Sequence, residues 1–283
     1  MFRTLILLAA ALALLAPPVS ARGDDGVTRQ LIDHCVGCSL PKDLRGLDLH
    51  GLRFVGDDLR DVDFSRANLR GADFTGADLD GTRFDDADLR DARFTGVRLR
   101  GVSFARANVA GIRFVGVSVD QEAIDGATGA ILLRECTGCS LRGLDLHGVD
   151  LHGSRIVGAD LHDANLAGTN LRDARLVGVN ARDTDFSGSD LRGANVVGAR
   201  LHGARLARAT LGDAILCGEN RNDWGEARTV CADLDGVDLH GIDLRAVRWC
   251  PSRDDAPGAC RTVTRRELIE DAHADLRGAQ TPA

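Results

Sequence analysis

Eight cysteines are the residues of this chain whose type and spacing most readily suggest chemistry. Four of them form two C-x-x-C pairs, a spacing found in redox disulfides and in zinc sites. Each pair is soon followed by the same heptapeptide, Arg-Gly-Leu-Asp-Leu-His-Gly, which indicates an internal duplication. The eight are Cys35, Cys38, Cys136, Cys139, Cys217, Cys231, Cys250 and Cys260.

The C-x-x-C pairs have three open interpretations. A redox pair normally begins a helix in a thioredoxin-like βαβ unit, and no such pattern surrounds these cysteines. A zinc site would need both pairs at one ion, with Cys35, Cys38, Cys136 and Cys139 as its four ligands. An even number of cysteines in an exported chain favours disulfides, which we therefore predict within each pair. Proximity suggests two further local pairings, 217–231 and 250–260.

The histidines and carboxylates give no catalytic signature. His50, His147 and His240 occupy the same place in three copies of one motif, which the duplication explains. His162 and His202 would lie two coils apart on one face, too far to share a metal ion. The sequence holds no G-x-S-x-G, phosphate-loop or H-E-x-x-H motif. We therefore predict no enzyme activity, no cofactor and no metal site.

A strict five-residue period organises most of the chain. A large apolar residue recurs at every fifth position, with a small residue two places before it and Asp or Asn between them. This period is neither that of a helix nor that of a strand. The clearest copies are Ala72-Asp73-Phe74, Ala77-Asp78-Leu79, Ala87-Asp88-Leu89, Ala159-Asp160-Leu161 and Ala164-Asn165-Leu166.

This pattern resembles that of the pentapeptide-repeat family, A-(D/N)-L-x-x. The resemblance implies an all-β solenoid, a right-handed quadrilateral β-helix in which four pentapeptides make one square coil and residues twenty apart stack. The large central residue and the small residue before it would point inward. Phe alternates with Leu or Val between Phe54 and Val119, so Phe should fill two opposite faces of the core.

The flanking segments indicate export and capping. Arg3 precedes an apolar run from Leu5 to Leu15, and the small residue Ala21 offers a cleavage site. A membrane anchor is the alternative, but we expect cleavage and no stable anchor. The predicted N-terminal half consists of a signal peptide 1–21, an N-terminal helical cap with C-x-x-C 22–40, a first repeat block 41–120, and a break and second helical cap with C-x-x-C 121–140. It is followed by a second block 141–218, a loop and short third block 219–250 that would close on Trp249, and a C-terminal capping helix within 251–283, from Thr264 to about Leu276.

The family resemblance also implies one known role, that of a rod that mimics DNA and interacts with gyrase. Such mimicry needs a stripe of acidic charge, yet each face mixes signs, as with Asp58, Asp78 and Arg98 twenty apart. Export would also separate the protein from gyrase. We keep this role as an alternative, a metal or redox protein as a second alternative, and predict no nucleic-acid partner.

One outward row is apolar. Val157, Val177 and Val197 follow the central residue of one face at twenty-residue intervals. β-Branched residues can simply favour the extended backbone there. The functional interpretation is a flat face that docks the other half of the chain, a second copy in a homodimer, or another protein. We expect a non-enzymatic scaffold that acts by protein–protein recognition in the periplasm or outside the cell.

Overall fold

The corners of the repeat follow from two local interactions. The Asp or Asn before each central residue accepts the backbone N–H two residues further on, as Asp63 Oδ1 does from Ser65 at 2.9 Å. The residue two places after the centre then takes a positive φ, which Gly71 adopts at +66° and Asp61 at +57°. Glycine is frequent there because this conformation costs it least.

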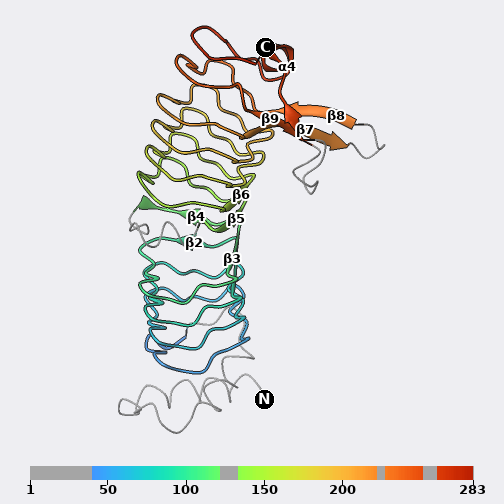
Figure 1. Ribbon diagram of the computed structural model, residues 1–283. Coiled ribbons are helices and arrows are strands. Elements are labelled where there is room, and N and C mark those ends of the chain that lie inside the picture. Colours follow the sequence, from blue (N-terminus) through green and yellow to red (C-terminus); the bar gives the residue numbers. More distant parts are fainter. Residues whose placement is uncertain (1–39, 122–132, 222–226, 251–259, 283) are drawn as a thin grey trace, which may run out of the picture.

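The computed structural model describes residues 40–121, 133–221, 227–250 and 260–282. They stack into one column of square coils, with the N-terminal coils at one end and the C-terminal segment at the other (Figure 1). Residues twenty apart form parallel bridges, such as Asp73 with Arg93. Backbone bonds such as Gly71 N–H to the Arg90 carbonyl, at 2.8 Å, join each coil to the next.

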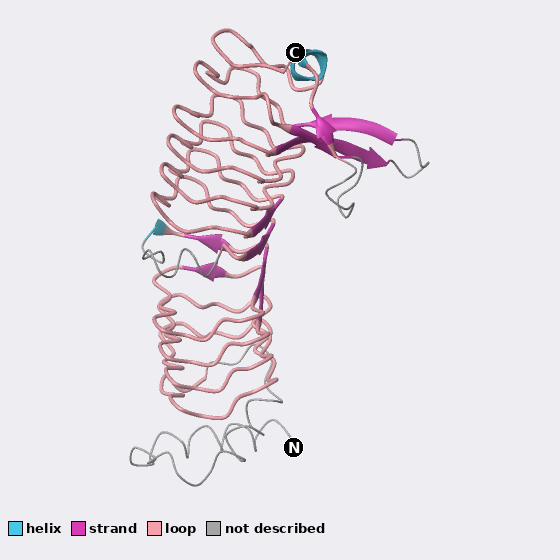
Figure 2. Cartoon of the chain, in the orientation of Figure 1, coloured by secondary structure: helices cyan, strands magenta, loops and turns pink. Residues whose placement is uncertain are grey.

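Short strands lie among the loops and turns of the column (Figure 2). One parallel sheet has the order β1-β3-β5-β6 and a second pairs β2 with β4. Their bounds are β1 Arg93–Thr95, β2 Arg98–Leu99, β3 Arg113–Val115, β4 Ser118–Val119, β5 Glu135–Thr137 and β6 Arg155–Val157.

Phenylalanine stacks fill the core of the first block. Phe54, Phe74 and Phe94 stack on one face with ring centroids 5.0 and 4.7 Å apart. Phe64 and Phe84 stack at 5.4 Å on the opposite face, and Phe64 meets Phe74 edge to face at 6.2 Å. All of these rings are fully buried. The prediction that Phe occupies two opposite faces is therefore confirmed.

The two blocks form one continuous column, and the expected helical cap between them is wrong for its described part. Phe114 pairs with Cys136 of β5, which in turn pairs with Ile156 of β6. This coil has twenty-two residues between stacked centres, and Cys136 takes the place of the central residue. The backbone is extended there rather than helical, because the extended conformation continues the hydrogen-bonded ladder to the coils on both sides. The part of the expected break and cap that spans 122–132 lies outside the described residues.

A four-stranded sheet forms near the C-terminal end, with the order β10-β9-β7-β8. Its strands are β7 Ile215–Arg221, β8 Ala227–Cys231, β9 Arg248–Cys250 and β10 Arg261–Thr262. β7 and β8 form an antiparallel hairpin that projects from the column, where the sequence suggested only a polar loop. Trp249 is half-buried and packs against the core, on a strand that is shifted in register against β7.

The C-terminal helix is shorter than predicted. α4 spans Arg265–Glu270, and its N-cap Thr264 forms the expected capping box with Glu267. Beyond the C-cap Asp271 the chain returns to the stack, where the Ala272 carbonyl accepts the Leu234 N–H at 2.8 Å. Further helix would leave such N–H groups of the last coil unpaired. No helix among the described residues is long and apolar enough to cross a membrane.

Candidate docking surface

One face of the column carries three parallel rows of residues, which we call together the arginine–valine face. Its middle row follows the buried central residues and is uncharged throughout. This row is Val55, Thr75, Thr95, Val115, Thr137, Val157, Val177 and Val197. Cross-coil pairing aligns it directly, with Val115 opposite both Thr95 and Thr137.

Glycine forms the second row of this face without interruption. The row is Gly56, Gly76, Gly96, Gly116, Gly138, Gly158, Gly178 and Gly198, each with a positive φ. Its N–H groups donate to the carbonyls of the middle row in the next coil, as Gly178 does to Val197 at 2.9 Å. This part of the face is therefore flat, without charged side chains, and satisfied in its backbone hydrogen bonds.

The third row, just before the central residues, is mainly basic. It consists of Arg53, Asp73, Arg93, Arg113, Glu135, Arg155 and Arg175. Five arginines against two carboxylates make this row positive, although the whole chain has a net charge of −7. Arg155 forms an ion pair with Glu135, in which Arg155 Nε lies 3.4 Å from Glu135 Oε2. The basic row beside the uncharged rows gives this face an attraction for anionic groups.

The hairpin of β7 and β8 stands at the C-terminal end of this face. A disulfide joins Cys217 to Cys231 at its neck, where the two Cα atoms are 3.9 Å apart. Above it, a second disulfide joins Cys250 to Cys260 and fixes the end of β9. These are the local pairings predicted from the sequence.

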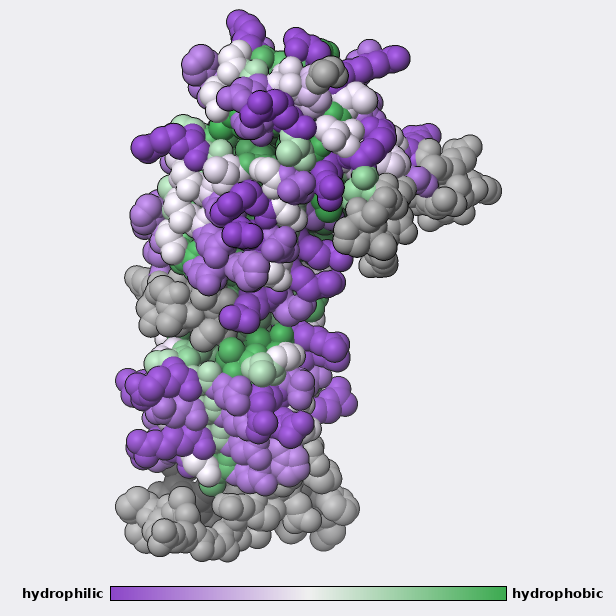
Figure 3. Space-filling view, in the orientation of Figure 1, coloured by the Kyte–Doolittle hydropathy of each residue, from purple (hydrophilic) through white to green (hydrophobic). Residues whose placement is uncertain are grey.

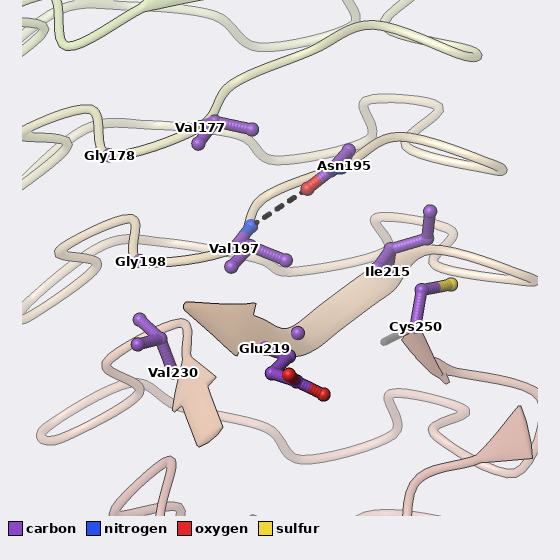
Figure 4. Close-up of a pocket in the computed structure, with 10 residues that line it drawn as sticks. Val177, Gly178, Asn195, Val197, Gly198, Ile215, Glu219, Val230 and Cys250 are labelled. Carbon is purple, nitrogen blue, oxygen red and sulfur yellow. Dashed lines mark hydrogen bonds between the residues drawn. The ribbon is translucent and has the colours of Figure 1, made fainter. Parts of the chain in front are cut away.

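A pocket of about 230 Å³ lies between the hairpin and the arginine–valine face (Figure 4). Val177 and Val197 line it from the column, and Val230 lines it from β8. Glycine keeps it open, because a Cβ on Gly218 would lie 3.3 Å from a Val197 methyl group. The remaining lining residues are Gly178, Asn195, Gly198, Ile215, Glu219 and Cys250.

The predicted valine row is thus partly enclosed by the chain itself. Val177, expected at the surface, is 4 % exposed, whereas Val157 and Val197 are half-buried. Within the first block, Val115 of the same row is 41 % exposed. In the space-filling view, hydrophilic side chains cover most of the visible surface and apolar residues show in narrow strips between them (Figure 3).

The four cysteines of the C-x-x-C pairs divide into a buried disulfide and a pair outside the described residues. Cys136 and Cys139 are buried in the core and joined by a disulfide. Their sulfur atoms are bonded to each other and so are not thiolate ligands in this structure. Cys35 and Cys38, like the predicted signal peptide and first cap, lie outside the described residues.

The histidines of the described ranges are not gathered into one site. His162 lies 3.3 Å from Asp163 and 3.7 Å from Asp183, and these three could jointly offer ligand atoms to a cation. Arg142 already contacts Asp163 at 3.5 Å, and the Arg182 carbonyl lies 2.9 Å from His162 Nδ1, so the cluster has partners within the chain. His202 contacts a different carboxylate, Asp235, at 3.2 Å.

The geometry defines a repeat column, a quadrilateral β-helix whose side faces are available for recognition. The family profile described as Pentapeptide repeats matches in eight copies, over residues 48–86, 58–96, 82–119, 154–193 and 184–218. The chain belongs to the pentapeptide-repeat family.

Solved structures of other pentapeptide repeat proteins match the chain. HetL from the cyanobacterium Nostoc, involved in heterocyst differentiation regulation, is 28% identical, with 67% of this chain and 78% of that chain covered and a TM-score of 0.30. QnrB1, a plasmid-mediated fluoroquinolone resistance protein, is 20% identical over 73% and 93%, with a TM-score of 0.25. A protein from the cyanobacterium Cyanothece is 18% identical over 61% and 90%, with a TM-score of 0.20.

These superposition scores are low, so we base no functional argument on the matched structures. No curated protein sequence matches this chain significantly.

Proposed function

We propose that this protein is an exported, non-enzymatic scaffold that acts by protein–protein recognition through its arginine–valine face. The observation that carries the proposal is the uninterrupted run of uncharged β-branched and glycine rows over eight successive coils, bordered by a mainly basic row. Flat, partly apolar strips bordered by polar residues are typical of interaction surfaces.

The disulfides support the export part of this proposal. Three bonds, 136–139, 217–231 and 250–260, involve every described cysteine. Disulfides persist mainly in secreted and periplasmic proteins, because cytosolic thiols are kept reduced. The apolar run that precedes Ala21 fits the same compartment.

Two carboxylates beside the corners are paired with arginine, as fits a structural role for these two residues. Arg192 hydrogen-bonds Asp190 and lowers the pKa of that carboxyl to about 2. Arg245 likewise lowers the pKa of Asp243 to about 2. A carboxyl group with such a pKa stays ionised at neutral pH and is a poor general acid or base there, where catalysis favours a pKa near the working pH.

The experiment that tests this function is site-specific photo-crosslinking in fractionated cells. A photo-reactive amino acid would replace Val115 on the arginine–valine face or, as the control, Ala110 on another face. We expect a chain that begins at Arg22 in the periplasm or medium, with protein adducts from position 115 only. Equal adducts from both positions, or none, would refute recognition through this face. An uncleaved cytosolic chain would refute export and make gyrase inhibition the assay to run.

A further inference from the structure

We propose that the arginine–valine face and strand β8 together bind an extended, acidic segment of a partner protein, which pairs with the free edge of β8. This inference rests on the proposed function and specifies the chemistry of its partner. It combines an edge strand, a partly apolar pocket and a basic row at one place on the molecule.

β8 is an edge strand of its sheet, since its one described strand partner is β7. In the antiparallel register Cys217 lies opposite Cys231, and their Cα separation of 3.9 Å is that of a non-hydrogen-bonded pair. Hydrogen-bonded and non-hydrogen-bonded pairs alternate along an antiparallel ladder, so Thr229 and Glu219, two residues further on, also form a non-hydrogen-bonded pair. The N–H and C=O groups of Thr229 therefore point to the free edge, and the residue is exposed.

The pocket supplies a place for an apolar side chain of the bound segment. Val230, the neighbour of Thr229, lines the pocket together with Val177 and Val197. A segment paired with β8 would thus have one of its side chains beside these three valines. A volume of about 230 Å³ accommodates an aliphatic side chain such as Val, Leu or Ile.

The charge of the segment follows from the arginines beside the pocket. Arg175 lies two residues before Val177 and is bridged across the coils to Arg155. Arg175 is half-buried, and its guanidinium places positive charge beside the pocket that a carboxylate of a bound segment would complement. The basic row extends further along the column to Arg113 and Arg93.

An extended peptide fits these features better than other occupants. Strand addition supplies main-chain hydrogen bonds, alternate side chains enter pockets, and charges on the other side chains select the partner. Aliphatic residues alternating with Glu or Asp would match the pocket and the arginines at once.

Fluorescence anisotropy with the full oxidised chain tests the proposal. The probe is a labelled ten-residue peptide of alternating Glu and Val, and its control replaces Glu with Lys. We expect the Glu peptide to bind at least ~10-fold more tightly than the Lys peptide, and more weakly at high salt. Equal binding of the two peptides would overturn the proposal.

Variants assign the binding to this site. The pair Arg155→Gln and Arg175→Gln should weaken the Glu peptide about 10-fold, whereas Arg172→Gln with Arg182→Gln, on other faces, should leave it unchanged. Thr229→Pro, which removes one N–H from the free edge but no bond to β7, should also weaken it about 10-fold. Circular dichroism verifies that each variant folds. Insensitivity of binding to all of these changes would overturn the proposal.

Two other occupants give different results. Tighter binding to phosphatidylglycerol vesicles than to neutral vesicles, abolished by the Arg155 and Arg175 changes and without peptide binding, would replace the peptide by a lipid surface. Concentration-dependent dimerisation that the same changes abolish would replace it by a second copy. If crosslinking from position 115 still traps a protein, the recognition function stands although this partner class is wrong.

Discussion

The Asp173 carboxylate lies where a side chain of Gly193, in the next coil, would begin. A Cβ placed on Gly193 would be 2.2 Å from Asp173 Oδ1, and the glycine itself has φ +69°. The same relationship joins three further pairs, which are Asp61 with Gly81, Asp91 with Gly111 and Asp183 with Gly203. In these four pairs the Asp carboxylate occupies the space that a side chain at the corner above would need, and that corner is glycine.

Gly193→Ala should therefore destabilise the column more than an ordinary glycine corner does. Gly188→Ala, at φ +67° with nothing within 4 Å of the added Cβ, is the matched control. We expect the free energy of unfolding, measured with urea, to fall by about 1 kcal/mol in the control and by about 2–3 kcal/mol in Gly193→Ala.

Asp173→Ala should recover the difference in a double-mutant cycle, because it removes the carboxylate from the added methyl group. Equal losses for Gly188→Ala and Gly193→Ala would contradict the interaction between the two corners.

Phe84→Ala should be strongly destabilising. Phe84 is fully buried and stacks on Phe64 at 5.4 Å and on Phe104 at 5.2 Å, so its loss leaves a cavity in a narrow core. We expect a loss of about 3–5 kcal/mol in the free energy of unfolding. Phe84→Leu, which places at this site the residue used in other coils, should lose less than half as much. Similar losses for both variants would argue against the ring stack as a stabilising feature.

The repeat made most of this column predictable. The inward pair of residues, the corner residues and the two phenylalanine faces all follow from a local rule that each pentapeptide repeats. The helix start at Thr264 was also predictable, because a capping box lies within four residues. In each case the determining interactions are close in sequence or fixed by the twenty-residue register.

Interactions without that register were harder to predict. The segment around Cys136 forms a strand because it pairs with the strand that contains Phe114, across a coil of twenty-two residues. No local sequence pattern encodes this pairing. The burial of Val177 depends on a hairpin that the repeat does not specify. The β-branched pair Thr229 and Val230 just before Cys231 was the one signal for that hairpin.

Acid should loosen the C-terminal helix. Arg261 hydrogen-bonds Glu267 and lowers the pKa of that carboxyl to about 2, from an ordinary value of 4.5. The ionised group stabilises the fold, so its contribution is full above about pH 4.5 and is lost as the pH falls toward 2. The protection factor of the Leu268 amide in hydrogen exchange, which corrects for the intrinsic pH dependence of exchange, should therefore fall over this range.

Glu267→Gln should cost about 1 kcal/mol of local stability at neutral pH and remove most of that acid dependence. Glu270→Gln, at the other end of α4, is the control and should keep it. An unchanged pH profile in Glu267→Gln would refute this account of the cap.

Removing the disulfide at the hairpin neck should affect the hairpin before the column. In the double variant Cys217→Ser and Cys231→Ser, trypsin should cut after the exposed Arg228 at least ~10-fold faster, because opening is no longer restrained. Cys250→Ser with Cys260→Ser leaves the β7–β8 pairing in place and is the control. Equal cleavage rates in both variants would contradict local restraint by the neck.

Because of that neck, the segment inserted after Leu216 could be replaced by another segment without disturbing the stack. The chain leaves and re-enters the stack at Cα atoms 3.9 Å apart, and Ala232 resumes with its N–H bonded to the Leu216 carbonyl at 2.7 Å. The length and sequence between the two cysteines are therefore decoupled from the periodicity below and above. Evolution could diversify what this rod displays by replacing one insert, and a protein engineer could graft a foreign epitope there in the same way.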